Sequence, residues 1–232
     1  MPEIILYTAH HCPYAHRAQI ALRELGLSFE EKLVDITVPR TNEYLTVNPN
    51  GMVPALSYDG ILLTESSLIV QFLLDSHPSH LLKGSTEPSG ALQRFRMGYF
   101  VDMYFVKVHP IFDKIVYADG SPAKDMAVDE YVGSVAKHVE PLLSNAAPFF
   151  GASQRLTLVE ALTGPFLLRV LKYPNHEMLV PARLVKDLTL RAPSFWKWAQ
   201  AVISEPSVTS VWNENLVVER TLEKIEKKRN MS

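Results

Sequence analysis

Cys12 is the single cysteine of this 232-residue chain, and its position offers the clearest chemistry in the sequence. It directly precedes Pro13, where a β-strand over 4–8 is expected to give way to a helix over 14–25. Proline suits the first helical position, because its missing N–H has no helical partner there. A sulfur at the cap faces unpaired amides and the positive end of the helix dipole, which favour a thiolate. The sequence therefore predicts a nucleophilic cysteine; the alternative interpretation is a small buried side chain.

Cys12 has no neighbouring cysteine with which to form an internal disulfide. Ala15 stands where a second cysteine would complete a Cys-x-x-Cys pair, so a redox cycle must pass through a mixed disulfide with an outside thiol. Glutathione is the small thiol that a reducing cell supplies. A lone cysteine excludes a disulfide framework, and the histidines lack the spacing of a zinc site, so we expect no metal. His10, His11 and His16 are expected to add positive potential near Cys12, although His16 also suits a packed or solvent-facing position.

A second motif is Met52-Val53-Pro54-Ala55, which leads into an expected strand. Proline cannot donate to a β-ladder and is tolerated at the start of a strand. A cis bond before Pro54 would turn the backbone N–H and C=O of Val53 outward, where they could pair with a peptide-like ligand. The alternative is an ordinary trans proline at a sheet edge. Together with a cysteine at a helix start, the motif favours the cis form.

A third motif, Thr64-Glu65-Ser66-Ser67, follows a strand and opens a helix. A helix N-terminus can hold a carboxylate with its free amides, and the hydroxyl of Ser66 could contribute. Glu65 beside it could pair with an ammonium group, so the two residues suit the α-amino acid end of a ligand. The alternative is a capping motif that only satisfies the helix start.

The expected elements over residues 1–80 follow the order β-α-β-α-β-β-α. Asp59-Gly60 is a strong two-residue hairpin signal, and His77-Pro78 ends the last helix. This order predicts an α/β, thioredoxin-like domain with a mixed four-stranded sheet. Strands are expected over 4–8, 28–35, 52–58 and 61–64, and helices over 14–25, 41–45 and 66–76.

The sequence changes character after about residue 88. Residues 77–88, HPSHLLKGSTEP, are the expected linker. Residues 88–232 show no convincing strand, and proline and glycine clusters separate long helical patterns, which predicts an all-α helical bundle as the C-terminal domain. These patterns cover 91–116, 125–146, 157–173, 182–190, 193–203 and 213–228.

The composition of the chain limits the classes of binding partner that we expect. The chain has 23 basic and 25 acidic residues, a formal charge of −2, which gives no sign of nucleic-acid or membrane-surface binding. A hydrophobic content of 47% is ample for a core. The N-terminus lacks the pattern of a secretory signal, and the apolar run over 68–74 is too short to span a bilayer. We therefore expect a cytoplasmic protein, with the basic cluster near the C-terminus as a solvated helix end.

The motifs in their order resemble the glutathione transferase superfamily over nearly the whole chain. The Cys-Pro-Tyr-Ala-His-Arg stretch over 12–17 is similar to the cysteine-type classes, namely Omega and its fungal, plant and bacterial relatives. The better-known classes use tyrosine or serine there. The other matching segments are NPNGMVP at 48–54, Glu65-Ser66, TLVE at 157–160, RAPSFWKW at 191–198 and EPSV at 205–208.

The resemblance implies roles for individual residues around the thiol. Cys12 matches the cysteine that forms a mixed disulfide with glutathione, and Tyr14 matches the aromatic residue packed two positions beyond it. Val53, held before Pro54, would pair through its backbone with the cysteinyl part of glutathione.

The remaining glutathione-binding residues are implied in the same way. Glu65 and Ser66 would hold the γ-glutamyl end, and Arg40 lies where a basic residue often meets the glycine carboxylate. Residues 157–160 match a helix-capping box in which relatives usually carry aspartate, and glutamate at its third position is still a proper partner.

The second substrate is expected to meet the helical domain. Tyr99, Met103 and His109 belong to an aromatic-rich face that is expected to be mainly core. One or two of them, together with Trp212, are expected to line the wall opposite Cys12.

The resemblance implies a glutathione-dependent transferase with glutathione as co-substrate. The leading hypothesis is a thioltransferase or deglutathionylase that reduces mixed disulfides or glutathionyl ketones, with dehydroascorbate reduction as a further activity of the same site. One alternative is a glutathione-dependent isomerase or conjugating enzyme for a specific metabolite. Another is a non-catalytic binding module on the same fold. The partners would be glutathione, a small electrophilic or disulfide substrate and a second copy of the chain, since the family usually forms homodimers.

Overall fold

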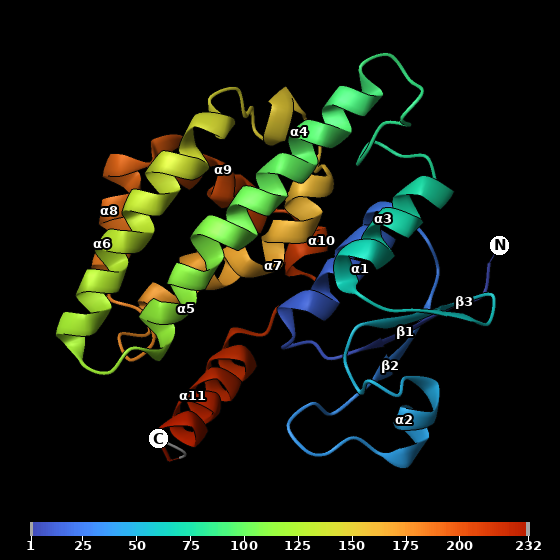
Figure 1. The fold of residues 1–232 in the computed structure, drawn as a ribbon, viewed down its shortest axis with the longest axis horizontal. Helices are drawn as coiled ribbons and strands as arrows, with labels where there is room; N and C mark the ends of the chain where they lie inside the picture. Colours follow the sequence, from blue (N-terminus) through green and yellow to red (C-terminus); the bar gives the residue numbers. More distant parts are fainter. Residues whose placement is uncertain (1, 231–232) are drawn as a thin grey trace.

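A four-stranded sheet forms the first part of the computed structural model, which describes residues 2–230 (Figure 1). Its strand order is β2-β1-β3-β4, with β1 parallel to β2 and antiparallel to β3. Ile4, Leu6 and Thr8 alternate into the core, as expected for a strand with two unlike faces. The elements are β1 (Ile4–Thr8), α1 (Pro13–Glu24), β2 (Glu30–Leu33), α2 (Asn42–Val47), β3 (Ala55–Tyr58), β4 (Ile61–Leu63) and α3 (Ser66–Ser76).

The second part of the fold is helical. All named elements from Gly90 onward in the described chain are helices, and the expected thioredoxin-like domain followed by a helical domain is confirmed. The α-helices are α4 (Gly90–Met103), α5 (His109–Tyr117), α6 (Ser121–His138), α7 (Leu158–Lys172), α8 (Arg183–Arg191), α9 (Pro193–Ile203), α10 (Pro206–Thr209) and α11 (Glu214–Asn230). Short 3₁₀ segments cover Glu140–Leu143, Phe150–Ala152 and Tyr173–Asn175.

Most predicted elements are confirmed, with shifts at their ends. Helices over 66–76 and 193–203 have the predicted bounds, whereas the second strand is shorter than the predicted 28–35. The long pattern over 91–116 is a helical segment interrupted by a π-helical turn, Tyr104–Val108, which ends two residues before Pro110. A π turn adds one residue to the helix and rotates the following side chains by about 100° relative to a regular α-helix.

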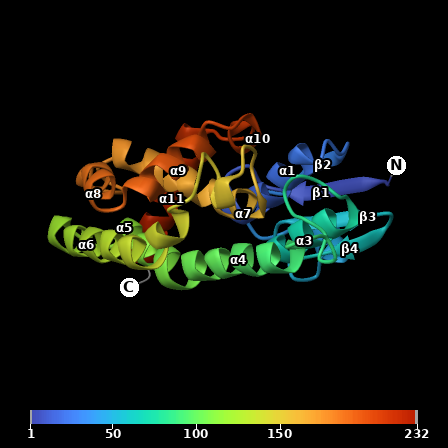
Figure 2. The ribbon, with the colours of Figure 1, turned by 90° about the horizontal axis from the view of Figure 1, so that it is seen from above.

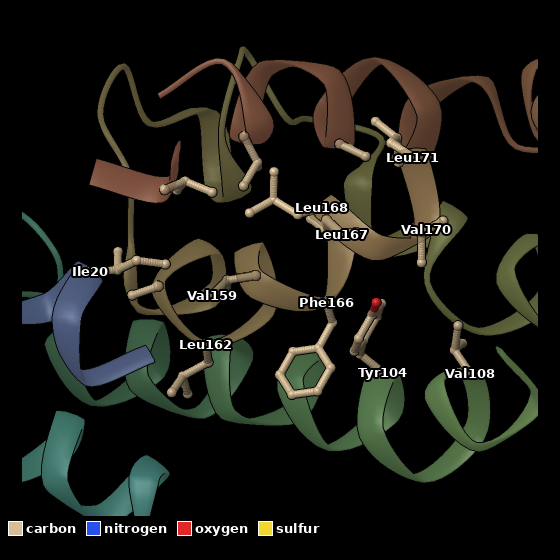
Figure 3. Packing of buried hydrophobic residues seen from close by; sticks show 14 of the residues in the cluster. Ile20, Tyr104, Val108, Val159, Leu162, Phe166, Leu167, Leu168, Val170 and Leu171 are labelled. Atoms are coloured by element: carbon tan, nitrogen blue, oxygen red, sulfur yellow. The ribbon is translucent and has the colours of Figure 1, made fainter. Parts of the chain in front are cut away.

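Helix α1 packs against α3 on one side and against α7 on the other. Side chains from both parts of the chain therefore belong to one continuous hydrophobic core. Helix α7 is buried on all sides and lies between α4 and the layer of α9 and α10 (Figure 2). Figure 3 shows Leu162 and Phe166 of α7 pointing towards the helix that carries Tyr104, with Ile20 of α1 at the edge of the same cluster.

The start of α7 is fixed by the predicted capping box. Thr157 Oγ1 accepts from the N–H of Val159, and Glu160 Oε2 accepts from the N–H and hydroxyl of Thr157 at 2.8 and 2.6 Å. The other oxygen of Glu160 accepts from the N–H of Phe150 and the indole of Trp198. Burial raises the pKa of Glu160, and the four donors act in the opposite direction. One carboxylate thus joins α7, α9 and the loop at Phe150.

No helix among residues 2–230 is long and apolar enough to cross a membrane.

The Glu160 network leads to a prediction about stability. Glu160→Gln replaces one acceptor oxygen by an NH₂ group, so that buried donors face another donor. We expect a loss of about 3 kcal/mol in the free energy of unfolding, or about 6–12 °C in the melting temperature. Glu226→Gln, on the exposed side of α11, is the matched control and should leave the melting temperature unchanged. Equal melting temperatures for the two variants would show that the Glu160 network does not make this contribution to stability.

Candidate active site

Cys12 caps helix α1, as predicted. It has an extended backbone (φ −89°, ψ 117°), and Pro13 takes the first helical position. Its N–H donates to the carbonyl of Ala9 at 2.9 Å, and its side chain makes no capping bond. The sulfur lies 3.9 Å from the carbonyl oxygen of Val53. The residue is only 9% exposed, but it borders a cavity of about 390 Å³ between the two domains.

The loop before β3 brings Val53 to the thiol. The Val53–Pro54 peptide bond is cis, as predicted, and β3 begins directly after it at Ala55. Tyr44 donates its hydroxyl hydrogen bond to the carbonyl of Met52 at 2.6 Å, which fixes the neighbouring peptide. Gly51 has a φ of +64°, and a Cβ atom there would lie 3.1 Å from the side chain of Arg40, so the tight turn requires glycine.

A second cavity lies on the other side of Val53. Glu65 and Ser66, at the start of α3, line it together with Pro54. Tyr14 and Val53 line both cavities, so the space around Cys12 continues to the start of α3. The structure thus brings five of the predicted glutathione-binding residues to one continuous surface, and Arg40 lines the cavity at Cys12.

Glu65 occupies a strained backbone conformation. Its φ of +67° and ψ of 105° fall in a region that non-glycine residues rarely adopt. Such strain persists where the surrounding structure over-determines it, and it is concentrated at ligand clamps. The carboxylate of Glu65 is held at an exposed rim of the second cavity, beside the buried hydroxyl of Ser66.

Arg17 is a residue of the candidate site that the sequence reasoning did not single out. It is buried on α1, and it donates through Nη1 to Ser66 Oγ at 3.0 Å and through Nε to the carbonyl of Leu162 at 2.9 Å. Its guanidinium lies over the rings of Phe105 and Phe166, 4.3 and 4.9 Å from their centres. Burial lowers the pKa of Arg17 to about 10, so it stays charged at neutral pH. It orients Ser66 and ties the two domains together.

Three further cations line the cavity at Cys12. Arg169 comes from α7, and Arg220 and Lys224 come from α11, whose start lies beside the start of α1 in Figure 1. Their signal in the sequence is weak, because they lie more than 150 residues away from Cys12. Arg220 and Lys224 are four residues apart on a helix, which is the spacing of side chains on one face.

The histidines beside Cys12 do not supply the predicted positive potential. Burial is the main cause that lowers the pKa of His11, and nearby Lys224, Arg220 and Arg169 lower it further. Burial lowers the pKa of His16 to about 3. Both rings are therefore neutral at neutral pH and add no positive potential, and His16 is buried, in the packed position that the sequence also allowed. The local positive charge comes from arginine and lysine.

The wall opposite Cys12 differs from the predicted one. His109 lines the cavity, whereas Tyr99 lies in a separate surface hollow, and Met103 and Trp212 do not line the cavity either. Tyr99 points outward with 46% of its surface exposed, Met103 packs against the core, and Trp212 lies under Arg169. The π-helical turn between Met103 and His109 explains why a regular helical period did not separate these side chains.

Arg40 lies in the cavity, but most of its donors are already used. Its guanidinium donates to the carbonyls of Gly51, Asp35 and Val38 at 2.9, 2.9 and 2.6 Å. A fourth contact, with Ile36, is longer at 3.4 Å. Arg40 therefore shapes the loop that carries Val53, and its charge faces the cavity from there.

Comparisons with known proteins agree with this architecture. A family model described as the N-terminal domain of glutathione S-transferase matches residues 11–76. Glutathione S-transferase GstA of Escherichia coli O157:H7 is 29% identical over 173 residues, covering 73% of this chain and 81% of the relative. Over these regions the chain is similar to glutathione S-transferases.

Further similar proteins extend the match into the helical domain. The crystal structure of glutathione transferase Omega 2C from Trametes versicolor superimposes with a TM-score of 0.82 at 27% identity, covering 97% of this chain and 100% of the other. A maleylacetoacetate isomerase of Rhizobium meliloti (strain 1021) is 27% identical over 154 residues, 62% of this chain and 70% of the relative. The chain is thus similar to glutathione transferases over both the sheet-containing and the helical part of its fold.

Arg17 provides a prediction at the domain boundary. Arg17→Lys keeps the charge but cannot reach Ser66 and Leu162 together with a planar fork, nor lie flat on the two phenyl rings. We expect a loss of about 1–3 kcal/mol in the free energy of unfolding, measured as a lower denaturant midpoint. Arg23→Lys is the matched control, because Arg23 is exposed on the same helix. A midpoint for Arg17→Lys that equals the control would contradict this role.

Proposed function

We propose that the protein is a glutathione-dependent thioltransferase or deglutathionylase in which Cys12 is the nucleophile. The observation that carries the proposal is the position of Cys12 at a helix cap, with its sulfur beside the carbonyl of Val53 and in a cavity that continues to Glu65 and Ser66. A thiol at a helix start next to a backbone that can pair with a tripeptide suits exchange between glutathione and a second molecule. The cysteine-type, Omega-like subclass is part of this proposal.

The proposed reaction has two exchange steps. In the first, the thiolate of Cys12 attacks the glutathionyl sulfur of a mixed disulfide; the S–S bond breaks, the substrate sulfur leaves as a thiolate and takes up a proton, and Cys12 carries the glutathionyl group. In the second, the thiolate of another glutathione attacks that group, which releases glutathione disulfide and restores the Cys12 thiolate. The substrate is reduced and two glutathione units are joined, so electrons balance.

The site residues would orient glutathione for both steps. The backbone of Val53, fixed before Pro54, would pair with the cysteinyl part of glutathione. The carboxylate of Glu65 would bind its α-ammonium group, while Ser66, oriented by Arg17, would bind the α-carboxylate at the start of α3. Tyr14 would pack beside the ligand, because it lines both cavities. Its ring is held edge-on to Phe166, with the ring centres 5.2 Å apart.

The glycine carboxylate of glutathione would lie near Arg40, whose charge faces the cavity from the loop before Val53. Because Arg40 already donates to backbone carbonyls, it would attract the glycine carboxylate mainly through its charge. The reaction needs reduced glutathione, and the cytoplasm is our proposed location. Mixed disulfides, glutathionyl ketones and dehydroascorbate are the candidate second substrates.

A second candidate is a glutathione-dependent isomerase. The similarity to a maleylacetoacetate isomerase favours it, although no substrate follows from that name for this chain. A panel of unsaturated dicarbonyl compounds with catalytic glutathione discriminates the two, because isomerisation consumes no glutathione whereas disulfide reduction does.

The central prediction concerns Cys12. We expect Cys12→Ala to abolish glutathione-dependent reduction of 2-hydroxyethyl disulfide, with a loss of at least about 100-fold in kcat/KM, because no other thiol in the chain can replace the nucleophile. Circular dichroism and calorimetric binding of glutathione check that the variant is folded and still binds. Retained reductase activity would refute the assignment. No activity in either protein, with glutathione bound, would favour the isomerase.

We also propose that the protein forms a homodimer through exposed apolar side chains on α3, α4 and β4, which lie along one side in Figure 2. Phe95 and Tyr99 of α4 are exposed and their rings stack at 6.3 Å, and Leu92 lies on the same helix. Leu62 and Leu68 are exposed apolar residues of the thioredoxin-like domain, on β4 and α3. Exposed apolar clusters of this kind mark protein interfaces. A second copy is the proposed occupant, pairing the small domain of one subunit with the helical domain of the other.

The dimer is tested by placing a charge in this patch. Phe95→Glu should convert a dimer into a monomer, measured by size-exclusion chromatography with light scattering. Leu190→Glu introduces the same charge at an equally exposed leucine on α8 and should leave the mass unchanged. A monomeric wild-type protein, or a dimer that survives Phe95→Glu, would contradict the proposed interface.

A further inference from the structure

The cavity at Cys12 has more positive charge than the proposed glutathione contacts use. Arg169, Arg220 and Lys224 line its helical-domain side, away from Glu65 and Ser66. The one carboxylate among its lining residues is Asp113, whose pKa is raised mainly by burial. With Arg40, the lining has four cationic residues and a single weakened acid, and this balance favours a ligand with negative charge.

Arg169 is the deepest of the three cations. It is buried, and its guanidinium donates to the carbonyls of Pro165 and His11 at 2.7 and 2.8 Å. The guanidinium carbon of Arg169 lies 5.4 Å from the ring centre of Trp212. Among the described residues, no carboxylate lies within ion-pair distance of it. Its two hydrogen bonds go to neutral carbonyl oxygens, so no anionic partner in the described chain compensates its charge beside the cavity.

The two cations of α11 are more accessible. Arg220 is half-buried and forms a bidentate contact with Glu223 at 2.8 and 2.9 Å, which compensates part of its charge. Lys224 is exposed and forms no hydrogen bond or ion pair in the part of the chain that the structure describes. Both lower the pKa of His11, which is the neighbour of Cys12; burial is the larger cause of that shift. Their field therefore reaches the residue next to the nucleophile.

Flat aromatic side chains make up much of the lining of the same cavity. Phe166 and Tyr14 meet edge to face, and Phe112 stacks on Tyr173 at 6.1 Å. Tyr117 completes this lining. Aromatic walls favour planar ligands through offset or edge contacts. One cavity thus brings together the thiol, aromatic side chains and cationic groups, and Arg169 donates to the carbonyl of His11, the residue next to Cys12.

We propose that the second substrate is a planar, preferably aromatic, disulfide or electrophile that carries a carboxylate group. Its reactive atom meets Cys12, its ring lies on the aromatic wall, and its carboxylate lies between Arg169, Arg220 and Lys224. The inference rests on the proposed function, because it assumes that Cys12 is the nucleophile, and it adds the substrate class.

The test uses the fact that Cys12 is the only cysteine. Reaction of the purified protein with an aromatic disulfide, in the absence of glutathione, therefore reports this thiol alone. The anionic probe is 5,5′-dithiobis(2-nitrobenzoic acid) and the neutral probe is 4,4′-dithiodipyridine. With each, the Cys12 thiolate attacks one sulfur, the S–S bond breaks, and one coloured aryl thiolate or thione leaves per chain.

The ratio of the two second-order rate constants is the readout. Lys224→Gln and Arg220→Gln should each lower the ratio of the anionic-probe rate to the neutral-probe rate about fivefold, as expected for loss of a partly screened unit charge; any change in the thiolate itself affects both rates and cancels in the ratio. Asp113→Asn should raise the anionic rate. Lys227→Gln, an exposed residue of α11 outside the cavity lining, is the matched control and should change neither rate.

The outcomes separate the two proposals. If Cys12 reacts with both probes and the ratio is the same in all variants, the substrate class is wrong while the thioltransferase remains. If Cys12 reacts with neither probe, the proposed function itself fails. If Lys224→Gln instead raises the KM for glutathione in 2-hydroxyethyl disulfide reduction, the cations bind glutathione, and the substrate class is again overturned.

Discussion

Helix α1 is packed between two domains, and this burial fixes the place where the rest of the site must assemble. Its inner face contacts α3 beside the sheet, and its other side contacts α7 of the helical domain. A helix held on two sides cannot rotate without breaking one of the contacts, so its N-terminus is fixed at the boundary between the domains. Cys12 lies at that N-terminus, and both domains therefore contribute residues to its cavity.

Arg17 reinforces the same boundary with polar contacts. It connects α1 to a carbonyl of α7 and to Ser66 of α3, and aromatic rings from the helical domain cover its guanidinium. Removing a charge from water is expensive, and such a group persists only where its hydrogen bonds are satisfied. Here carbonyl and hydroxyl oxygens satisfy them, so the positive charge of Arg17 is retained close to the site.

Much of this arrangement could be predicted from the sequence because its signals are local. A Cys-Pro pair at a helix start, a proline before a strand and a capping box each involve a few neighbouring residues, and each was found where the sequence placed it. The cationic rim could not be found in this way. Arg169 and Lys224 are ordinary helical residues until the fold brings α7 and α11 to α1. The direction of the His109 side chain could not be predicted for another reason. A π-helical turn rotates the side chains that follow it away from the positions that a regular helical pattern assumes.

The hydrogen-bond partners of the buried arginines explain how the site can be stable and still keep its positive charge. A buried arginine paired with a carboxylate would add specificity to the fold but cancel the field that a thiolate or an anionic ligand needs. Arg17 and Arg169 donate to neutral oxygens, so their charges remain available to the cavity. The neutral rings of His11 and His16 show the cost of that field, because burial and the nearby cations both disfavour a further positive charge. The site therefore concentrates its positive charge in guanidinium groups, which keep it despite burial, and leaves the region around Cys12 favourable for anions.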